Sequence, residues 1–203
     1  ETGINSSMVD NTVPANLRGP NNEWVGIAKR SRVIYYNPLN VSEAEMAGLT
    51  YEDLSDSKWK GRIAIRSSGN MYNQSLVSSL IANHGEATIE AWAKDFVGNF
   101  ARKPEGNDRA QIMAVANGEA DIAIANSYYI GLMLSGKKGE EQQSAARKVQ
   151  LHFPGQDGRG AHINVSGAGL MKNAPNKSNA VKFIEFLLGE EAQSHIVNNT
   201  YEY

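Results

Sequence analysis

The sequence predicts an α/β fold with largely parallel strand pairing, and three observations support this. Short apolar segments typical of buried strands, RIAIR at 62–66 and DIAIA at 121–125, alternate with stretches whose apolar residues recur at helical spacing. Gly, Asn and Pro separate these segments. The 203 residues are 41% hydrophobic, which is enough to form a core. Strands that alternate with helices in this way favour a sheet covered by helices.

The first part of the chain is expected to begin irregularly and then form a strand. Residues 1–23 are polar, with Asn, Pro and Gly throughout, and indicate a loosely ordered lead-in. Residues 24–36 are rich in β-branched and aromatic side chains and predict one strand or two short ones, ended by Asn37-Pro38. The segment TYED at 50–53 has the spacing of a capping box and predicts the start of a short helix.

Along the chain, helices are expected both before and after the second apolar strand, 121–125. Gly85 and Gly118 have the sequence context of helix ends, and Asn107-Asp108 that of a helix start. Asn126, directly after DIAIA, occupies the position of a helix cap. The predicted helices here are 71–83, 88–100, 108–116 and 128–134.

The last third is expected to complete the sheet and add two helices. The segment 138–148 is charged and indicates an exposed surface stretch. Strands are predicted over 149–153 and 162–171, and apolar residues at helical spacing predict helices over 178–188 and 190–197.

Composition excludes several function classes. The formal net charge is -2 and the sequence pI about 6.1, so nucleic-acid binding and binding to an anionic membrane are not expected. No apolar run approaches the roughly 18 residues that span a bilayer, so direct membrane insertion is not expected. The absence of Cys removes disulfides and thiolate chemistry. An enzyme is not expected either, because there is no G-x-S-x-G elbow and the four His residues lack metal-ligand spacing.

Both ends of the sequence indicate a truncated parent. The segment ETG at 1–3 resembles a vector-derived leader, and the chain stops at Tyr203 without a closing element. We therefore expect a longer natural protein.

Three tyrosines are predicted to crowd one edge of the sheet. Tyr72 follows strand 62–66, and Tyr128 and Tyr129 follow strand 121–125. Ligands of open α/β sheets bind outside the carboxyl ends of the strands, where loops meet helix starts. Phenolate oxygen is a hard, anionic donor and suits ferric iron better than zinc or copper(I). Tyrosines that only pack at strand-to-helix junctions remain the alternative interpretation.

A helix start beside these tyrosines would also suit a small anion. Asn126 or Ser67-Ser68 is the expected position for a synergistic anion such as carbonate. The phenol has a reference pKa of about 10, so a metal must displace its proton, and affinity should fall as the medium turns acidic.

Several segments, taken together, resemble bacterial ferric-iron-binding proteins, the periplasmic substrate-binding components of iron(III) ABC transporters of the tyrosine-rich subclass. The resemblance covers nearly all of residues 13–203 in order. The segments that carry it are WVGIAKRSRVIYYN, WKGRIAIRSSGNMYNQSL, NGEADIAIANSYYIG, FPGQDGRGAHINVSGAGL and NAVKFIEFLLGEEAQ.

The resemblance implies a type II periplasmic-binding-protein fold and a set of metal ligands. The family's paired tyrosines correspond to Tyr128 and Tyr129, and its single upstream tyrosine to Tyr72. Arg32 matches an arginine that lies near the iron or its companion anion, with an exposed surface charge as the alternative. The implied function is extracytoplasmic or periplasmic binding of Fe(III) for delivery to a permease in the inner membrane.

The resemblance also implies that part of the fold is missing. Family members carry roughly a hundred further residues before the point matching Asn11, which gives one nearly complete lobe, crossing strands and part of a second lobe. The expected division is 1–23 lead-in, 24–37 crossing strands, 38–155 ligand-binding lobe, and 156–203 return strand and helices of the partial lobe. Two alternatives stay open: a binding protein for another small anion or organic ligand, and a lobe-only interaction module that self-associates through unpaired sheet edges.

Overall fold

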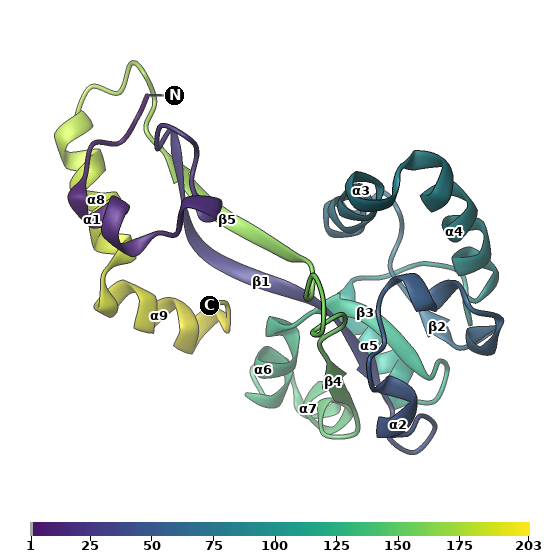
Figure 1. Cartoon of the computed structure of the whole chain (residues 1–203). Helices are drawn as coiled ribbons and strands as arrows, with labels where there is room; N and C mark the ends of the chain where they lie inside the picture. The colour runs from purple at the N-terminus through teal and green to yellow at the C-terminus, as the bar shows by residue number, and fades with distance from the viewer. Residues whose placement is uncertain (1) are drawn as a thin grey trace. The chain divides into compact units, whose positions relative to one another are not determined.

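The computed structural model describes residues 2–203, which form two compact units (Figure 1). Unit 1 contains the described residues up to Arg30 together with Asn164–Tyr203. Unit 2 is Ser31–Ile163. The long strand β1 (Trp24–Tyr36) contributes residues to both units.

Unit 2 is built on a mixed sheet with the strand order β2-β3-β1-β4. The strands that join β1 are β2 (Ile63–Ala64), β3 (Ile122–Asn126) and β4 (Gln150–His152). Among these four strands, β2 and β3 pair in parallel, whereas β1 is antiparallel to both β3 and β4. The prediction of largely parallel pairing is therefore wrong. The prediction assumed that each strand is joined to its neighbour by a crossover helix, which makes the two strands parallel. Unit 2 begins within β1, so no crossover helix of this unit leads into that strand.

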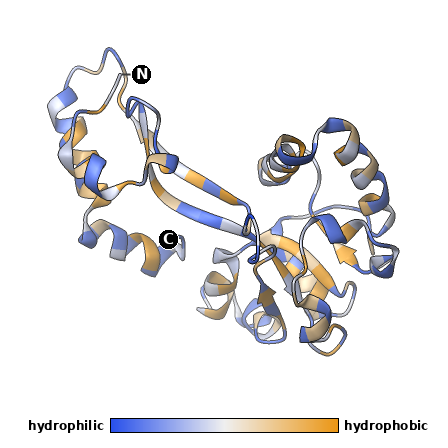
Figure 2. Cartoon of the chain, in the orientation of Figure 1, coloured by the Kyte–Doolittle hydropathy of each residue, from blue (hydrophilic) through white to orange (hydrophobic). Residues whose placement is uncertain are grey.

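The core of unit 2 lies on both faces of β3, whose five residues are all buried. Successive side chains of a strand point to opposite faces, so Ile122 and Ile124 pack with Trp59 on one face. Ala123 and Ala125 pack against α5 on the other face, where their small side chains allow the helix to come close. Figure 2 shows β3 as a mainly hydrophobic strand within this unit.

Helices cover both faces of this sheet, and those predicted from the sequence are confirmed to within a few residues. Helices α3 (Met71–His84) and α4 (Glu86–Gly98) cover the face that carries Ile122 (Figure 1). Helices α5 (Asp108–Ala116), α6 (Tyr128–Leu134) and α7 (Glu140–Ala146) cover the other. The shorter elements are α2 (Glu43–Met46) and two 3₁₀ helices, η2 (Glu52–Ser55) and η3 (Ser57–Trp59).

Two details show how local sequence sets helix ends. Gly85 ends α3 with φ of 82°, a left-handed conformation that a side chain at this position would disfavour. Thr50 and Asp53 form the predicted capping box, with the Thr50 N–H donating to Asp53 Oδ2 at 2.8 Å, but the element that follows is the 3₁₀ helix η2. The charged segment 138–148 contains α7, whose Ala145 and Ala146 are buried.

Unit 1 packs helices against the β1 and β5 (Ile163–Gly169) pair. Its C-terminal helices are α8 (Lys177–Leu188) and α9 (Glu190–Thr200). The segment predicted to be a loosely ordered lead-in contains α1 (Ser7–Thr12) and a 3₁₀ helix, η1 (Ala15–Leu17). Ser6 caps α1 by accepting from the Val9 N–H at 3.3 Å. Three apolar residues of this segment, Ile4, Val9 and Val13, explain why it is ordered, because they are buried in the core of the unit. The other members of this core are Val25, Leu170, Ile184 and Leu188.

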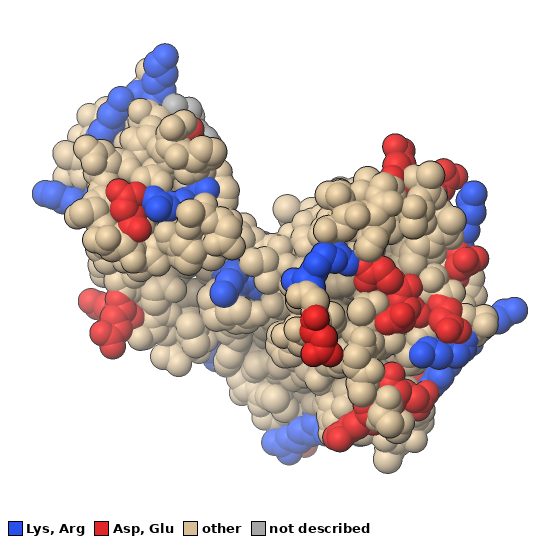
Figure 3. Space-filling model, viewed as in Figure 1, with Lys and Arg blue, Asp and Glu red and all other residues tan. Residues whose placement is uncertain are grey.

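Lys, Arg, Asp and Glu are interspersed over the face shown in Figure 3, so neither charge sign dominates it. Among residues 2–203, no helix is long and apolar enough to cross a bilayer.

Candidate metal centre

The sheet topology places Tyr72, Tyr128 and Tyr129 at one edge. Tyr72 is the second residue of α3, and its N–H donates to the Asn70 side chain at 3.0 Å. Tyr128 and Tyr129 open α6, directly after β3 and Ser127. Because β2 and β3 are parallel neighbours, their carboxyl ends meet at the same edge of the sheet. The structure therefore brings together the three tyrosines that the sequence predicts.

Tyr128 and Tyr129 form a close ring pair. Their ring centroids are 4.2 Å apart with 32° between the ring planes. Both side chains are half-buried. Consecutive residues of a helix project about 100° apart, so a shared contact of this kind is favoured only in the first turn. The start of α6 at Tyr128 provides that position.

The surroundings of Tyr128 hold its phenol in the neutral form. Burial is the main reason that its pKa is raised above the usual value of a tyrosine, and the hydrogen bond with Tyr129 adds to this effect. The nearby hydroxyls of Tyr129 and Tyr72 also disfavour a negative charge on Tyr128, whereas the Asn126 side chain acts in the opposite direction. Without a cation the cluster is therefore uncharged at Tyr128.

Arg32 is completely buried, so its interpretation as an exposed surface charge is wrong. Its guanidinium carbon is 5.9 Å from the centroid of the Tyr72 ring. One terminal nitrogen donates to Asp108 at 2.6 Å, and the other to Asn73 Oδ1 at 2.6 Å. The Nε atom has no partner within hydrogen-bond distance among the described residues.

Asp108, which sequence reasoning did not place in the site, is the buried counter-charge of Arg32. Its side chain has no exposed surface and also accepts from Arg66 at 3.2 Å. The backbone N–H of Asn126 donates to it at 2.8 Å. The pattern Asn107-Asp108 predicts only a helix start, and an acidic first-turn residue is ordinarily a solvated partner of the helix dipole. No sequence signal separated this aspartate from that common case.

Asn126 does not cap α6, so that prediction is wrong. Asn126 is the last residue of β3 and is fully buried, while the cap position belongs to Ser127, which makes no side-chain cap bond. The Asn126 side-chain oxygen instead accepts from Arg32 at 3.2 Å. The charged guanidinium of a buried arginine is a stronger donor than a peptide N–H at a half-exposed helix end. The Asn126 side chain therefore pairs with Arg32 instead of capping α6.

The serines of the other position predicted for an anion, Ser67 and Ser68, do not cap the helix that follows them. Ser67 and Ser68 are exposed, and the Ser67 hydroxyl accepts from the Gly69 N–H at 3.2 Å. The helix start that follows is capped by Asn70 rather than by either serine.

Other polar clusters of unit 2 do not form a metal centre of the usual kind. His162 contacts Ser75, with 2.9 Å between Nε2 and Oγ, and burial and the Arg32 charge lower its pKa. His84 and Arg159 both contact the Glu52 carboxylate. Across residues 2–203, no three His, Asp or Glu side chains gather so that they could hold a metal ion.

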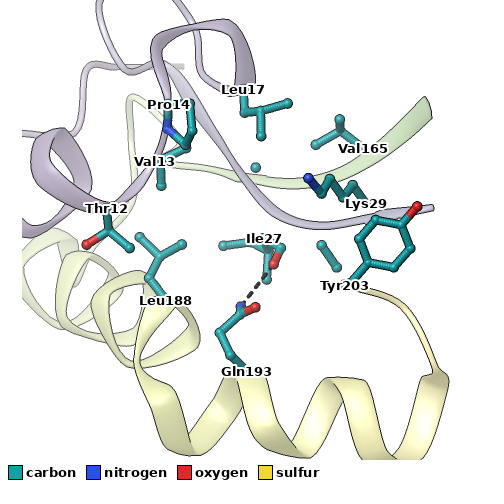
Figure 4. A pocket seen from close by; sticks show the side chains of 12 residues that line it. Thr12, Val13, Pro14, Leu17, Ile27, Lys29, Val165, Leu188, Gln193 and Tyr203 are labelled. Carbon is teal, nitrogen blue, oxygen red and sulfur yellow. Dashed lines mark hydrogen bonds between the residues drawn. The ribbon is translucent and has the colours of Figure 1, made fainter. Parts of the chain in front are cut away.

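A separate, mostly apolar pocket of about 180 Å³ lies within unit 1 (Figure 4). Ile27, Val165 and Leu188 contribute to its walls, and the Gln193 side chain closes one side by donating to the Ile27 carbonyl at 2.9 Å. None of the three candidate tyrosines lines it. Its lining does not supply the cluster of hard oxygen donors found at the start of α6.

Comparison with known proteins assigns the chain to a broad class. The sequence profile of a family described as bacterial extracellular solute-binding protein matches residues 2–203. Iron uptake protein A1 of Synechocystis sp. is 52% identical over 200 residues, which cover 98% of this chain and 55% of that protein. The Fe(3+)-binding periplasmic protein of Serratia marcescens is 31% identical, over 94% of this chain and 54% of that protein.

Solved structures agree with the fold described above. The Trichodesmium protein IdiA (FutA), solved in complex with iron and citrate ligands, superimposes with a TM-score of 0.94 and 53% identity. The match covers 100% of this chain and 63% of that one. A Bordetella ferric binding protein gives a TM-score of 0.91 at 38% identity. The expected type II periplasmic-binding-protein fold is confirmed, and the chain spans between about half and two thirds of the length of these proteins.

Proposed function

This chain belongs to the bacterial extracellular solute-binding proteins, and from that premise we propose that unit 2 binds ferric iron through the phenolates of Tyr72, Tyr128 and Tyr129. The observation that carries the proposal is that three phenols lie near one another at the carboxyl edge of β2 and β3, with the buried Arg32 beside the Tyr72 ring. Iron is cargo here, held for transfer and not used as a catalyst.

The chemistry of the donors supports Fe(III) over other cations. Phenolate is a hard anionic oxygen ligand, which a hard trivalent ion prefers. Since the raised pKa keeps the Tyr128 phenol neutral, only a strongly polarising ion displaces its proton at neutral pH. The Arg32 guanidinium lies 5.9 Å from the Tyr72 ring and adds a contact that fixes the ring's place in the site. Unit 2 would supply three ligands, and water, an anion or further protein groups would complete the coordination.

A companion anion has few donors left at Arg32. Its terminal nitrogens already donate to Asp108 and Asn73, which leaves Nε for an external anion such as carbonate. The Asn126 side chain is also buried, and it acts on the Tyr128 hydroxyl, where it opposes the rise in pKa. We therefore propose that a companion anion is held chiefly by the metal, with Arg32 Nε as its donor from unit 2.

The role of the whole protein follows from its relatives. Similar proteins carry names that include iron uptake and periplasmic Fe(3+) binding. We propose a periplasmic or otherwise extracytoplasmic location, delivery of iron to an ABC transporter permease in the inner membrane, and no enzymatic activity. The Ser75 hydroxyl lies 2.9 Å from His162 Nε2, and this contact of the imidazole is with a serine rather than with an orienting carboxylate.

A visible-absorbance titration tests the proposal. Phenolate bound to Fe(III) gives a charge-transfer band, so adding ferric citrate to chelator-stripped protein should produce a saturable band near one equivalent. The Tyr128→Phe/Tyr129→Phe double variant should lose most of that band. Tyr36→Phe is a matched control, because the Tyr36 hydroxyl bonds to Gln150 at the other end of β1 and β3. Equal binding by all three proteins would refute the assignment.

Self-association is a second candidate, favoured by one surface of unit 1. Phe183 and Phe186 of α8 are 59% and 51% exposed, and their rings stack with centroids 6.5 Å apart. Exposed aromatic pairs of this kind mark contact surfaces. The edge strands of the sheet in unit 2, β2 and β4, are only two and three residues long, so the apolar face of α8 is the better candidate than strand addition.

A further inference from the structure

Asp108 is the meeting point of three donors from three parts of unit 2. Its Oδ2 accepts from Arg32 of β1 at 2.6 Å and from the backbone N–H of Asn126, at the end of β3, at 2.8 Å. Its Oδ1 accepts from Arg66, in the loop after β2, at 3.2 Å. The side chain is completely buried at the start of α5.

Each donor leads directly to a candidate ligand. Arg32 also donates to Asn73 at 2.6 Å, and Asn73 is the chain neighbour of Tyr72. The Asn73 side-chain nitrogen donates to the Arg66 carbonyl at 2.8 Å, which closes a ring of contacts. Asn126 precedes Tyr128 by two residues, so the bond from its N–H fixes the end of β3 from which α6 starts.

We propose that Asp108 is the positioning residue of the metal centre: its buried carboxylate fixes Arg32, Asn126 and the loop after β2, and thereby sets the places of Tyr72 and Tyr128. This inference rests on the proposed function, since it concerns the geometry of the same ligands. Asp108 itself does not touch the metal in this arrangement.

The chemistry of the site requires a carboxylate at this position. All three groups that face Asp108 are donors, and an ionised carboxylate is an acceptor only. An asparagine would direct its amide NH₂ toward one of these donors and leave the buried Arg32 charge without its partner. The isosteric change Asp108→Asn is therefore the sharpest perturbation of the arrangement.

The test compares Asp108→Asn with Asp121→Asn in the full chain. Asp121 also pairs with an arginine, Arg62, at 2.5 Å, but it precedes β3 at the end opposite Asn126. Circular dichroism first establishes the temperature range in which each variant is folded. Within that range, Asp108→Asn should weaken Fe(III) binding at least tenfold in competition with citrate and shift the charge-transfer band. Asp121→Asn should leave both unchanged.

An iron-free measurement keeps the inference separate from the proposed function. In protein with labelled tyrosine rings, the NMR signals of Tyr72 and Tyr128 should move in Asp108→Asn and stay in place in Asp121→Asn. If the unmodified chain binds no iron, the proposed function fails while these ring signals still decide the positioning role. Unchanged ring signals in Asp108→Asn would overturn the inference. So would an Fe(III) affinity within about twofold of that of the unmodified chain together with an unshifted charge-transfer band. Arg66→Gln, at a side chain 19% exposed, gives a milder form of the same test if Asp108→Asn does not fold.

Discussion

The Tyr128 ring lies 4.2 Å from the ring of its neighbour Tyr129, measured between centroids, at the first turn of a helix that follows a buried strand. Two adjacent helical residues ordinarily diverge, so this pairing depends on where α6 begins. It places the two phenols side by side, and the nearness of Tyr129 adds to the rise in the pKa of Tyr128 that burial causes.

Tyr72→Phe should weaken iron binding without abolishing the charge-transfer band. The substitution removes one of three phenol oxygens and keeps the ring beside Arg32, so the change tests ligation rather than packing. We expect at least a tenfold loss of Fe(III) affinity, measured by chelator competition, with a weaker band from the two remaining tyrosines. Affinity equal to that of the unmodified chain would remove Tyr72 from the ligand set.

Iron affinity should fall steeply with acidification. Each phenol that binds as phenolate releases a proton, and burial raises the pKa of Tyr128, so protons compete more strongly as pH falls. One released proton lowers the apparent affinity about tenfold per pH unit, and three released protons lower it about a thousandfold. Competition with a chelator of known protonation behaviour, between about pH 8 and about pH 6, measures this slope. A slope of zero would contradict ligation by neutral phenols.

His162 should make unit 2 less stable in acid. Burial and the Arg32 charge lower the pKa of His162 below its ordinary 6.5, so the unfolded chain binds this proton more readily than the folded one. Stability from this residue is therefore present above the unfolded pKa and falls as pH decreases through about 6.5 toward the lower folded value. Thermal unfolding at neutral and mildly acidic pH should show a smaller acid loss in His162→Gln. An equal loss in both proteins would show that other groups dominate.

Arg32→Met should destabilise the fold far more than loss of a surface ion pair. It leaves the fully buried Asp108 without its closest counter-charge, which typically costs about 3 kcal/mol or more. Lys94→Met is the control, since Lys94 and Glu90 are 74% and 69% exposed and such pairs contribute about 0.5 kcal/mol or less. Urea unfolding of both variants measures the difference. Similar free energies of unfolding would show that Arg66 and Asn126 alone satisfy Asp108.

Phe183→Ser combined with Phe186→Ser should reduce any concentration-dependent association. Both side chains are more than half exposed on α8, and the substitution removes apolar surface without touching the buried Ile184. Sedimentation over a range of concentrations should show a shift toward monomer relative to the unmodified chain. An unchanged distribution would assign association to another surface.

Local sequence signals predicted most of the helices and the position of the three tyrosines after apolar strands. Apolar periodicity, the Gly85 stop and the Asn107 cap are read within a few residues, and they were confirmed. Tyr72 and Tyr128 follow apolar strands, and the parallel pairing of β2 with β3 brings the ends of those strands together.

The direction of β1 and the buried network were not predictable in the same way. Pairing of Arg32 with Asn126 across β1 and β3 joins residues far apart in sequence, and no local pattern sets it. Asn126 and Asp108 each have the local signature of a helix start, yet tertiary contacts with Arg32 take Asn126 away from that role and bury Asp108. Long-range ion pairing therefore decided the details that local sequence left open.

Locating the iron directly is the most decisive measurement. Crystals of the chain grown with Fe(III) and recorded at the iron absorption edge would show where the metal binds through its anomalous signal. The account predicts one strong peak within bonding distance of the Tyr72, Tyr128 and Tyr129 hydroxyls. A peak at another site, such as the Glu52 and His84 pair, would contradict it.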